Sequence, residues 1–149
     1  MAEQKLCTFW LNKTYFGIDV RHVQEVIRPQ AITPVPLTPP DICGLINLRG
    51  QIITVIDLQQ RLDMGQSAMR NIQPEAPQGF NIVVCSDQEV VSLVVDDVGD
   101  VLEFPQNTFQ PPPASLKGRM REILAGAYPL AEGFLFVIDT EKILNVKVI

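Results

Sequence analysis

Short apolar runs separated by turn-forming residues dominate the sequence, and this pattern predicts a protein built mainly of strands. The expected strands cover residues 7–11, 14–18, 43–48, 51–56, 82–85, 90–95, 98–104 and 134–138. Asn12 and Lys13 predict a hairpin turn between the first two runs, and Arg49 and Gly50 predict a tight turn between the third and the fourth. Residues 86–89 predict a further hairpin turn in the second half of the chain.

Three aspartates mark the expected starts of short helices, because an aspartate side chain can accept the free backbone N–H groups of a first helical turn. The expected helices follow Asp19, with Val20, Val23 and Ile27 on one face and Pro29 at the end; Asp57, with Leu58 and Leu62; and Asp139, with Ile143 and Leu144. Residues 32–35 predict a short extended piece, residues 106–113 a proline-rich loop, and residues 121–128 a strand or an irregular run.

The two halves of the chain resemble each other. Residues 56–62 parallel residues 138–144, each as a strand, a capping aspartate and a helix, and residues 18–26 parallel residues 95–101. Two copies of one small β unit would bury little alone, so we expect two barrels that pack face to face and share a core. We expect a single domain over residues 1–149, with a first barrel half over residues 1–63, a flexible connection over 64–79 and a second barrel half over 80–149; strands near the boundary can cross between the barrels.

Charge and composition narrow the classes of function. The chain has 149 residues, a net charge of −5 and a pI near 4.8, which argues against a nucleic-acid-binding barrel because an acidic chain repels phosphate backbones. Residues 1–5 lack the apolar core of a signal peptide and no apolar run has the length of a bilayer span, so we expect a cytoplasmic protein. Cys7, Cys43 and Cys85 lie far apart in apolar runs, and we expect buried, reduced thiols.

The sequence offers no catalytic set. Its single histidine, His22, has no evident orienting partner, and we expect it to be exposed to solvent. The spacings typical of zinc sites, phosphate loops and nucleophile elbows are missing, and Asp96, Asp97 and Asp100 do not follow the calcium-loop pattern. We therefore expect neither enzyme activity nor a metal ion or cofactor.

Arg49 stands in a tight turn between two very apolar strands. A guanidinium there needs a carboxylate partner or solvent. It either pairs internally, with Glu25 or Asp57, or projects from the end of a barrel to meet a carboxylate on another protein. The residues alone favour neither alternative.

Several motifs together resemble the CheW-like domain family. The matching residues are 15–20, 23–26, 36, 42–44, 46–50 and 55–58 in the first half, and 94–96, 98, 100–101, 138–139 and 143–144 in the second. The resemblance runs from about residue 7 to residue 145, and its most specific part is the block from Asn47 to Gly50. It implies two five-stranded SH3-like barrels related by a pseudo-two-fold axis, with short helices and a shared apolar core.

The resemblance also implies a function. Members of this family are non-catalytic adaptors that couple a CheA-type histidine kinase, through its regulatory domain, to the cytoplasmic helical tips of methyl-accepting chemotaxis receptors. Carried over to this chain, the receptor-binding positions are Val23, Glu25, Gly44, Arg49 and Val101. Kinase contacts are expected on exposed apolar residues at the barrel ends, without an assignment to particular residues. The protein would lie in the cytoplasm and be recruited to receptor arrays at the membrane.

Two alternatives remain open from the sequence. One is a paralogous adaptor for a parallel kinase pathway, such as twitching motility; Gln59, where many relatives have arginine, could alter the choice of partner. The other is a module that binds a small ligand in the groove between the barrels.

Overall fold

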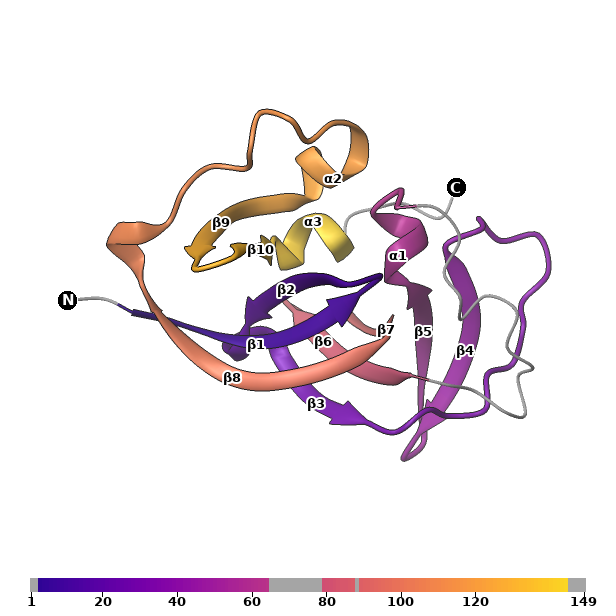
Figure 1. Cartoon of the computed structure of the whole chain (residues 1–149). Coiled ribbons are helices and arrows are strands. Elements are labelled where there is room, and N and C mark those ends of the chain that lie inside the picture. The colour runs from indigo at the N-terminus through magenta and orange to yellow at the C-terminus, as the bar shows by residue number, and fades with distance from the viewer. Residues whose placement is uncertain (1–2, 65–78, 88, 145–149) are drawn as a thin grey trace.

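The computed structural model describes residues 3–64, 79–87 and 89–144, which form two five-stranded sheets with short helices at their ends (Figure 1). Most of the predicted connection at residues 64–79 thus lies outside the described residues. The strands are β1 (Glu3–Leu11), β2 (Thr14–Asp19), β3 (Val23–Ile27), β4 (Ile42–Leu48), β5 (Gln51–Asp57), β6 (Phe80–Ser86), β7 (Glu89–Val95), β8 (Asp97–Pro105), β9 (Leu124–Leu130) and β10 (Gly133–Ile138). The helices are η1 (Val20–His22), α1 (Leu58–Arg61), η3 (Gln106–Thr108), α2 (Gly118–Ile123) and α3 (Thr140–Leu144). No helix in the described ranges is long and apolar enough to cross a membrane.

The order of the strands shows that the two sequence halves are interleaved. The sheet of barrel A has the order β8-β1-β2-β10-β9, and the sheet of barrel B has the order β3-β6-β7-β5-β4. The first half of the chain thus supplies β1 and β2 to barrel A but β3, β4 and β5 to barrel B. Strands do cross between the barrels, and the predicted division at residues 64–79 does not separate one barrel from the other.

The internal repeat is visible in the pairing of the strands. The β1–β2 hairpin corresponds to the β6–β7 hairpin, and each is followed by a strand, β3 or β8, that joins the edge of the opposite sheet. The second strand of each hairpin then pairs in parallel with the last strand of the other half, β2 with β10 and β7 with β5. This arrangement is the double SH3-like barrel predicted from the sequence.

Three apolar clusters form the interior of the protein. The largest lies between the sheets and takes buried residues from both, among them Phe9, Phe16, Ile56, Ile82 and Leu93. The other two clusters fill the single barrels. The interior of barrel B is lined by Ile46, Ile53, Val55, Val83 and Val94, and that of barrel A by Leu6, Tyr128, Leu135 and Val137. The alternation of side chains along each strand explains this division, because successive residues face the shared core and the barrel interior in turn.

The three predicted capping aspartates are confirmed. The backbone N–H of Arg21 donates to Asp19 Oδ1 at 2.9 Å, that of Gln60 to Asp57 Oδ1 at 3.2 Å, and that of Lys142 to Asp139 Oδ1 at 3.3 Å. Each places a short helical turn directly after a strand.

Three other predictions were wrong in part. The helix expected after Asp19 lasts only one 3₁₀ turn, and the chain then continues as β3, whose half-buried and exposed residues alternate with period two. The run at 121–128 begins inside α2, and only its part from Leu124 is a strand. His22 is half-buried rather than exposed, since its Nδ1 lies 2.9 Å from Thr140 Oγ1 on α3.

Candidate functional site

The turn between β4 and β5 projects Arg49 from barrel B. Arg49 and Gly50 both have positive φ angles, +52° and +88°, which suit the twist of a two-residue hairpin. The backbone N–H of Gly50 donates to Asn47 Oδ1 at 2.8 Å and stabilises the turn. The Arg49 side chain remains 66% exposed, so it is accessible to another protein.

Arg49 forms an ion pair with Glu25 on β3. The internal alternative is therefore realised with Glu25, while Asp57 caps α1. Because β3 and β4 are the two edges of the barrel B sheet, this pair joins the edges across the barrel. The Arg49 guanidinium lowers the pKa of Glu25, which keeps the carboxylate charged. Arg49 is exposed and the half-buried Glu25 side chain is still 26% exposed, so an internal pairing does not exclude a contact with a partner.

Gly44 is buried on β4, where another strand-like segment crosses it. Its φ angle is +148°, and a Cβ atom built on it would lie 2.2 Å from the carbonyl oxygen of Thr33. Thr33 and Leu45 exchange two backbone hydrogen bonds of 2.8 and 2.9 Å at this crossing. Gly44 thus has a clear structural role, and its predicted contact with a receptor remains a prediction.

The two predicted valines have different surroundings. Val23, at the start of β3, is half-buried and packs against the shared core. Val101 on β8 is 55% exposed. Both β3 and β8 are edge strands, at equivalent places in the repeat, and Figure 1 shows them on the same lower side of the molecule. The structure thus brings Glu25 and Arg49 into contact, and it places Val23 on the strand of Glu25 and Val101 on the other sheet.

A buried ion network escaped the sequence analysis. Arg61, the last residue of α1, is 2% exposed and donates from Nε to Asp41 Oδ2 at 2.8 Å. Its Nη1 donates to the carbonyl oxygen of Ile143 on α3 at 2.7 Å. The sequence signal was weak, because Arg61 and Asp41 lie 20 residues apart and a charged residue at the end of a surface helix is usually solvated.

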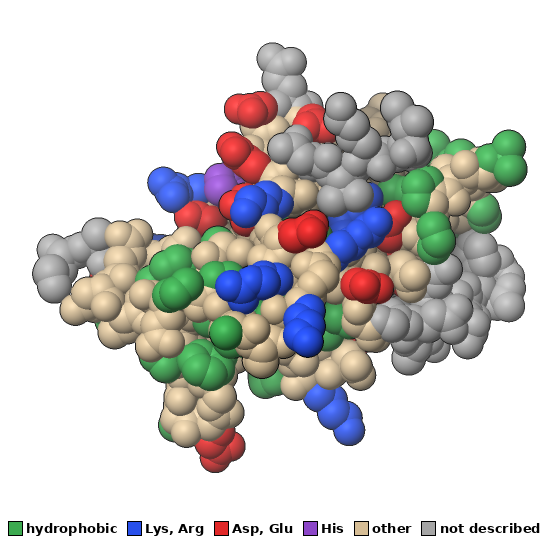
Figure 2. All heavy atoms as spheres, turned by 90° about the horizontal axis from the view of Figure 1, so that it is seen from above, with side chains coloured by type: hydrophobic (Ala, Val, Ile, Leu, Met, Phe, Trp, Pro, Cys, Tyr) green, Lys and Arg blue, Asp and Glu red, His purple; other side chains and the backbone are tan. Residues whose placement is uncertain are grey.

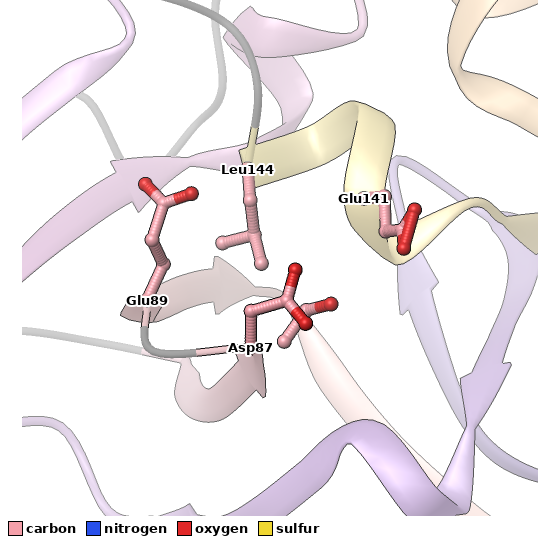
Figure 3. Close-up of a pocket in the computed structure, with 5 residues that line it drawn as sticks. Asp87, Glu89, Glu141 and Leu144 are labelled. Carbon is pink, nitrogen blue, oxygen red and sulfur yellow. The ribbon is translucent and has the colours of Figure 1, made fainter.

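An acidic hollow of about 70 Å³ lies between the β6–β7 hairpin and α3. Figure 3 shows Asp87 and Glu89 on the hairpin and Glu141 and Leu144 on α3. Among the residues that the structure describes, no group of histidine, cysteine and carboxylate side chains is arranged to hold a metal ion. Cys7, Cys43 and Cys85 form no disulfide; Cys7 is buried, which raises the pKa of its thiol, and the other two are half-buried.

Apolar side chains remain exposed outside the receptor-binding candidates. Figure 2, which views the molecule from above, shows a group of them at the right-hand end, where Figure 1 places the segment between β3 and β4. In that segment Leu37 is fully exposed. On barrel A, Trp10 of β1 is 40% exposed and stacks on Tyr15 of β2, with ring centroids 4.3 Å apart.

Comparisons with known proteins agree with this architecture. The model of the CheW-like domain family matches residues 5–148. The chain is 34% identical to the chemotaxis protein CheW of Klebsiella aerogenes over 143 residues, which cover 95% of this chain and 82% of that protein. It is 29% identical to the chemotaxis protein CheW of Treponema pallidum, over 96% of this chain and 83% of that protein. The chain is 29% identical to protein FrzA of Myxococcus xanthus, over 74% of this chain and 66% of that protein.

A solved structure shares the fold. The scaffolding protein TtCheW from Thermoanaerobacter tengcongensis superposes with a TM-score of 0.79 at 30% identity, covering 93% of this chain and 90% of that one. The family match spans both barrels and includes the exposed Arg49 turn. With its interleaved double barrel and with this match over nearly its whole length, the chain belongs to the CheW-like domain family.

Proposed function

We propose that this protein is a chemotaxis adaptor that couples a CheA-type histidine kinase to methyl-accepting chemotaxis receptors. The observation that carries the proposal is the match of the family model to residues 5–148. The proteins that it resembles include chemotaxis CheW proteins and a scaffolding protein. The adaptor has no chemistry of its own and acts by binding, in the cytoplasm at receptor arrays.

The receptor contact is formed by Val23, Glu25, Gly44, Arg49 and Val101 in this proposal. Glu25 and Arg49 present opposite charges side by side, so they can recognise a complementary pair on a receptor helix and set its register. Val101 offers exposed apolar area to the same helix. Val23 and Gly44 support this surface from its inner side. Val23 packs against the shared core, and Gly44 leaves room for the segment that crosses β4 at Thr33.

The kinase contact lies on exposed apolar side chains at the barrel ends. A solvated apolar group gains free energy when a partner covers it, and exposed apolar groups beside rigid strands lose little conformational entropy on binding. Residues 34–40 of barrel B, with the fully exposed Leu37, and the Trp10–Tyr15 stack of barrel A are two described groups that fit this requirement, and Ile52 of β5 is a further exposed apolar residue.

Reconstitution tests the proposal. Purified adaptor is mixed with a CheA-type kinase and with receptor-bearing membranes, and kinase autophosphorylation is measured with each component omitted in turn. We expect activation only when all three are present. Unchanged kinase activity on addition of the adaptor would refute the proposal, and activation of a kinase from a parallel pathway alone would assign the adaptor to that pathway.

Matched variants separate the receptor contact from the fold. Val101→Ser removes apolar area at a predicted receptor position, and Leu130→Ser removes it at an exposed residue of β9 outside the predicted set. We expect the first variant to reduce co-sedimentation with receptor membranes and the second to leave it unchanged. Equal losses in both variants would contradict the assignment of Val101.

A further inference from the structure

Arg61 joins three segments that are distant in sequence. From the end of α1, its guanidinium donates to Asp41 in the segment before β4 and to the carbonyl oxygen of Ile143 in α3. Arg119 of α2 adds a second guanidinium, with Nη1 3.6 Å from the same carboxylate oxygen. Residues of both barrels therefore converge on Asp41, whose side chain is only 5% exposed.

Asp41 directly follows the segment of residues 34–40, which is here called the apolar tip. At its start, the tip is held by the paired backbone hydrogen bonds between Thr33 and Leu45. At its end, the backbone N–H of Asp57 donates to the carbonyl oxygen of Asp41 at 2.9 Å, and that of Ile42 donates to Pro39 at 3.0 Å. The tip is thus a loop held by backbone hydrogen bonds at both ends, and at its second end the Asp41 side chain adds ion pairs with Arg61 and Arg119.

The tip exposes apolar groups in a conformation that needs support. Leu37 has a φ angle of +63° and a fully exposed side chain. A left-handed backbone at a non-glycine residue is unfavourable and persists where its surroundings hold it. Pro34, Pro36 and Pro40 are also exposed, and their rings restrict the tip further. The tip therefore presents a preformed apolar surface (Figure 2).

Stability does not explain why a charged pair anchors this loop. Burying an arginine and a carboxylate costs desolvation energy, and apolar side chains of the same size often stabilise a protein as well or better. The pair instead fixes geometry. The planar guanidinium of Arg61 donates to the Asp41 carboxylate and to the Ile143 carbonyl oxygen, so it sets the orientation of these two groups relative to each other.

We propose that Arg61 and Asp41 are positioning residues that hold the apolar tip in the conformation that binds the kinase regulatory domain. This inference rests on the adaptor function proposed above and adds residues that touch neither partner. The pair acts through the tip: when it is intact, the tip is preorganised, and binding need not spend free energy on ordering it. Through Ile143, the same pair ties the tip to α3, the helix that follows β10 of barrel A in the chain.

The experiment replaces the pair by apolar side chains of similar combined volume, in the double variant Arg61→Met/Asp41→Val. This change keeps the space filled and removes the directed hydrogen bonds of the pair. We expect thermal stability at or above that of the wild-type protein, and faster amide hydrogen exchange at Ile42 and Asp57, which are bonded at the end of the tip. Exchange at Thr33 and Leu45 should stay slow. If the binding-competent conformer falls to about one tenth of the population, the Kd for the isolated kinase regulatory domain rises about tenfold.

Two further variants keep the result decisive. Arg61→Lys retains the charge but lacks the planar group that donates to Asp41 and Ile143 together, so it should also weaken kinase binding. This variant tests the role of Arg61 if the double variant does not fold. Arg21→Met is the control, because it removes an 81% exposed arginine from an ion pair with Asp19 elsewhere on the surface. It should bind the kinase domain as the wild-type protein does.

The outcomes separate this inference from the adaptor function. If the wild-type protein does not bind the regulatory domain, the proposed function fails and the positioning role fails with it. If the wild-type protein binds and the folded Arg61 variants bind equally well, only the positioning role is overturned. The positioning role would also be overturned if binding weakened only in step with thermal stability, while hydrogen exchange at Ile42 and Asp57 showed no local change.

Discussion

Replacing Gly44 with alanine should destabilise the fold, because the added methyl group meets the backbone of the segment before β4. The new Cβ atom would lie 2.2 Å from the carbonyl oxygen of Thr33 and 2.8 Å from Cγ2 of Ile32. An L-residue also adopts the φ angle of +148° only under strain. Either the crossing segment moves away or β4 changes its backbone conformation.

The magnitude follows from these two effects. The unfavourable backbone conformation costs about 1–2 kcal/mol and the overpacking about 1–3 kcal/mol, so we expect a loss of about 2–5 kcal/mol. For a chain of this size, each kcal/mol lowers Tm by about 2–4 °C, which predicts a Tm lower by about 4–20 °C. Thermal unfolding followed by circular dichroism, with urea denaturation as a second measure, provides the assay.

Two other glycines serve as matched controls. Gly50 and Gly133 also have positive φ angles, +88° and +124°, but a Cβ atom on either would have nothing within 4 Å. Alanine at these positions should therefore show the backbone cost alone, about 1–2 kcal/mol. If Gly44→Ala were no more destabilising than Gly133→Ala, the crossing at Thr33 would not explain the glycine, and a direct role of Gly44 in receptor binding would become the better explanation.

Three further predictions follow from single contacts. In a double-mutant cycle, Glu25→Ala and Arg49→Ala should show almost no coupling free energy in urea denaturation, because the pair lies at the surface and is screened by solvent. Each single variant should nevertheless bind the receptor about tenfold more weakly, because it loses one charge-assisted contact worth about 1.5 kcal/mol. If stability in urea and receptor affinity fell together, the pair would have a purely internal role. Asn47→Ala should cost about 1 kcal/mol in the same assay, because Gly50 N–H loses its acceptor. Hydrogen bonds from Arg21 lower the pKa of Asp19 from 3.8 to about 2. Asp19 therefore contributes stability that is present above pH about 4 and is lost as the pH falls towards 2, and solvent screening at the 81% exposed Arg21 keeps this contribution small. Asp19→Asn should destabilise the protein at pH 7 and have little effect near pH 2, and an effect independent of pH would contradict the ion pair.

Local signals in the sequence predicted most of the elements. The hairpin turns and the capping aspartates depend on a few neighbouring residues, so they can be recognised without knowledge of the fold. The prediction failed at β3, where Val20, Val23 and Ile27 have helical spacing although the chain is extended from Val23. Both periods fit so short a segment, and pairing of β3 with β6, which lies more than 50 residues further along the chain, decided between them.

The features that could not be predicted from the sequence depend on contacts between residues far apart in the chain. The exchange of β3 and β8 between the sheets depends on how the shared core is buried, and no local pattern encodes it. The buried position of Arg61 depends in the same way on Asp41 and Ile143. For Arg49, the sequence correctly offered Glu25 as a partner, but only the structure shows that the pair is also exposed.

The five predicted receptor positions therefore fall into two groups, and this division determines how their variants can be interpreted. Val23 packs against the shared core and Gly44 beneath a crossing segment, so substitutions there disturb the fold and can abolish coupling without removing any receptor contact. Glu25, Arg49 and Val101 are accessible, and substitutions there leave the core intact. Since loss of coupling alone cannot distinguish the two causes, the receptor surface is best defined by the accessible group, with the thermal stability of each variant measured beside its binding.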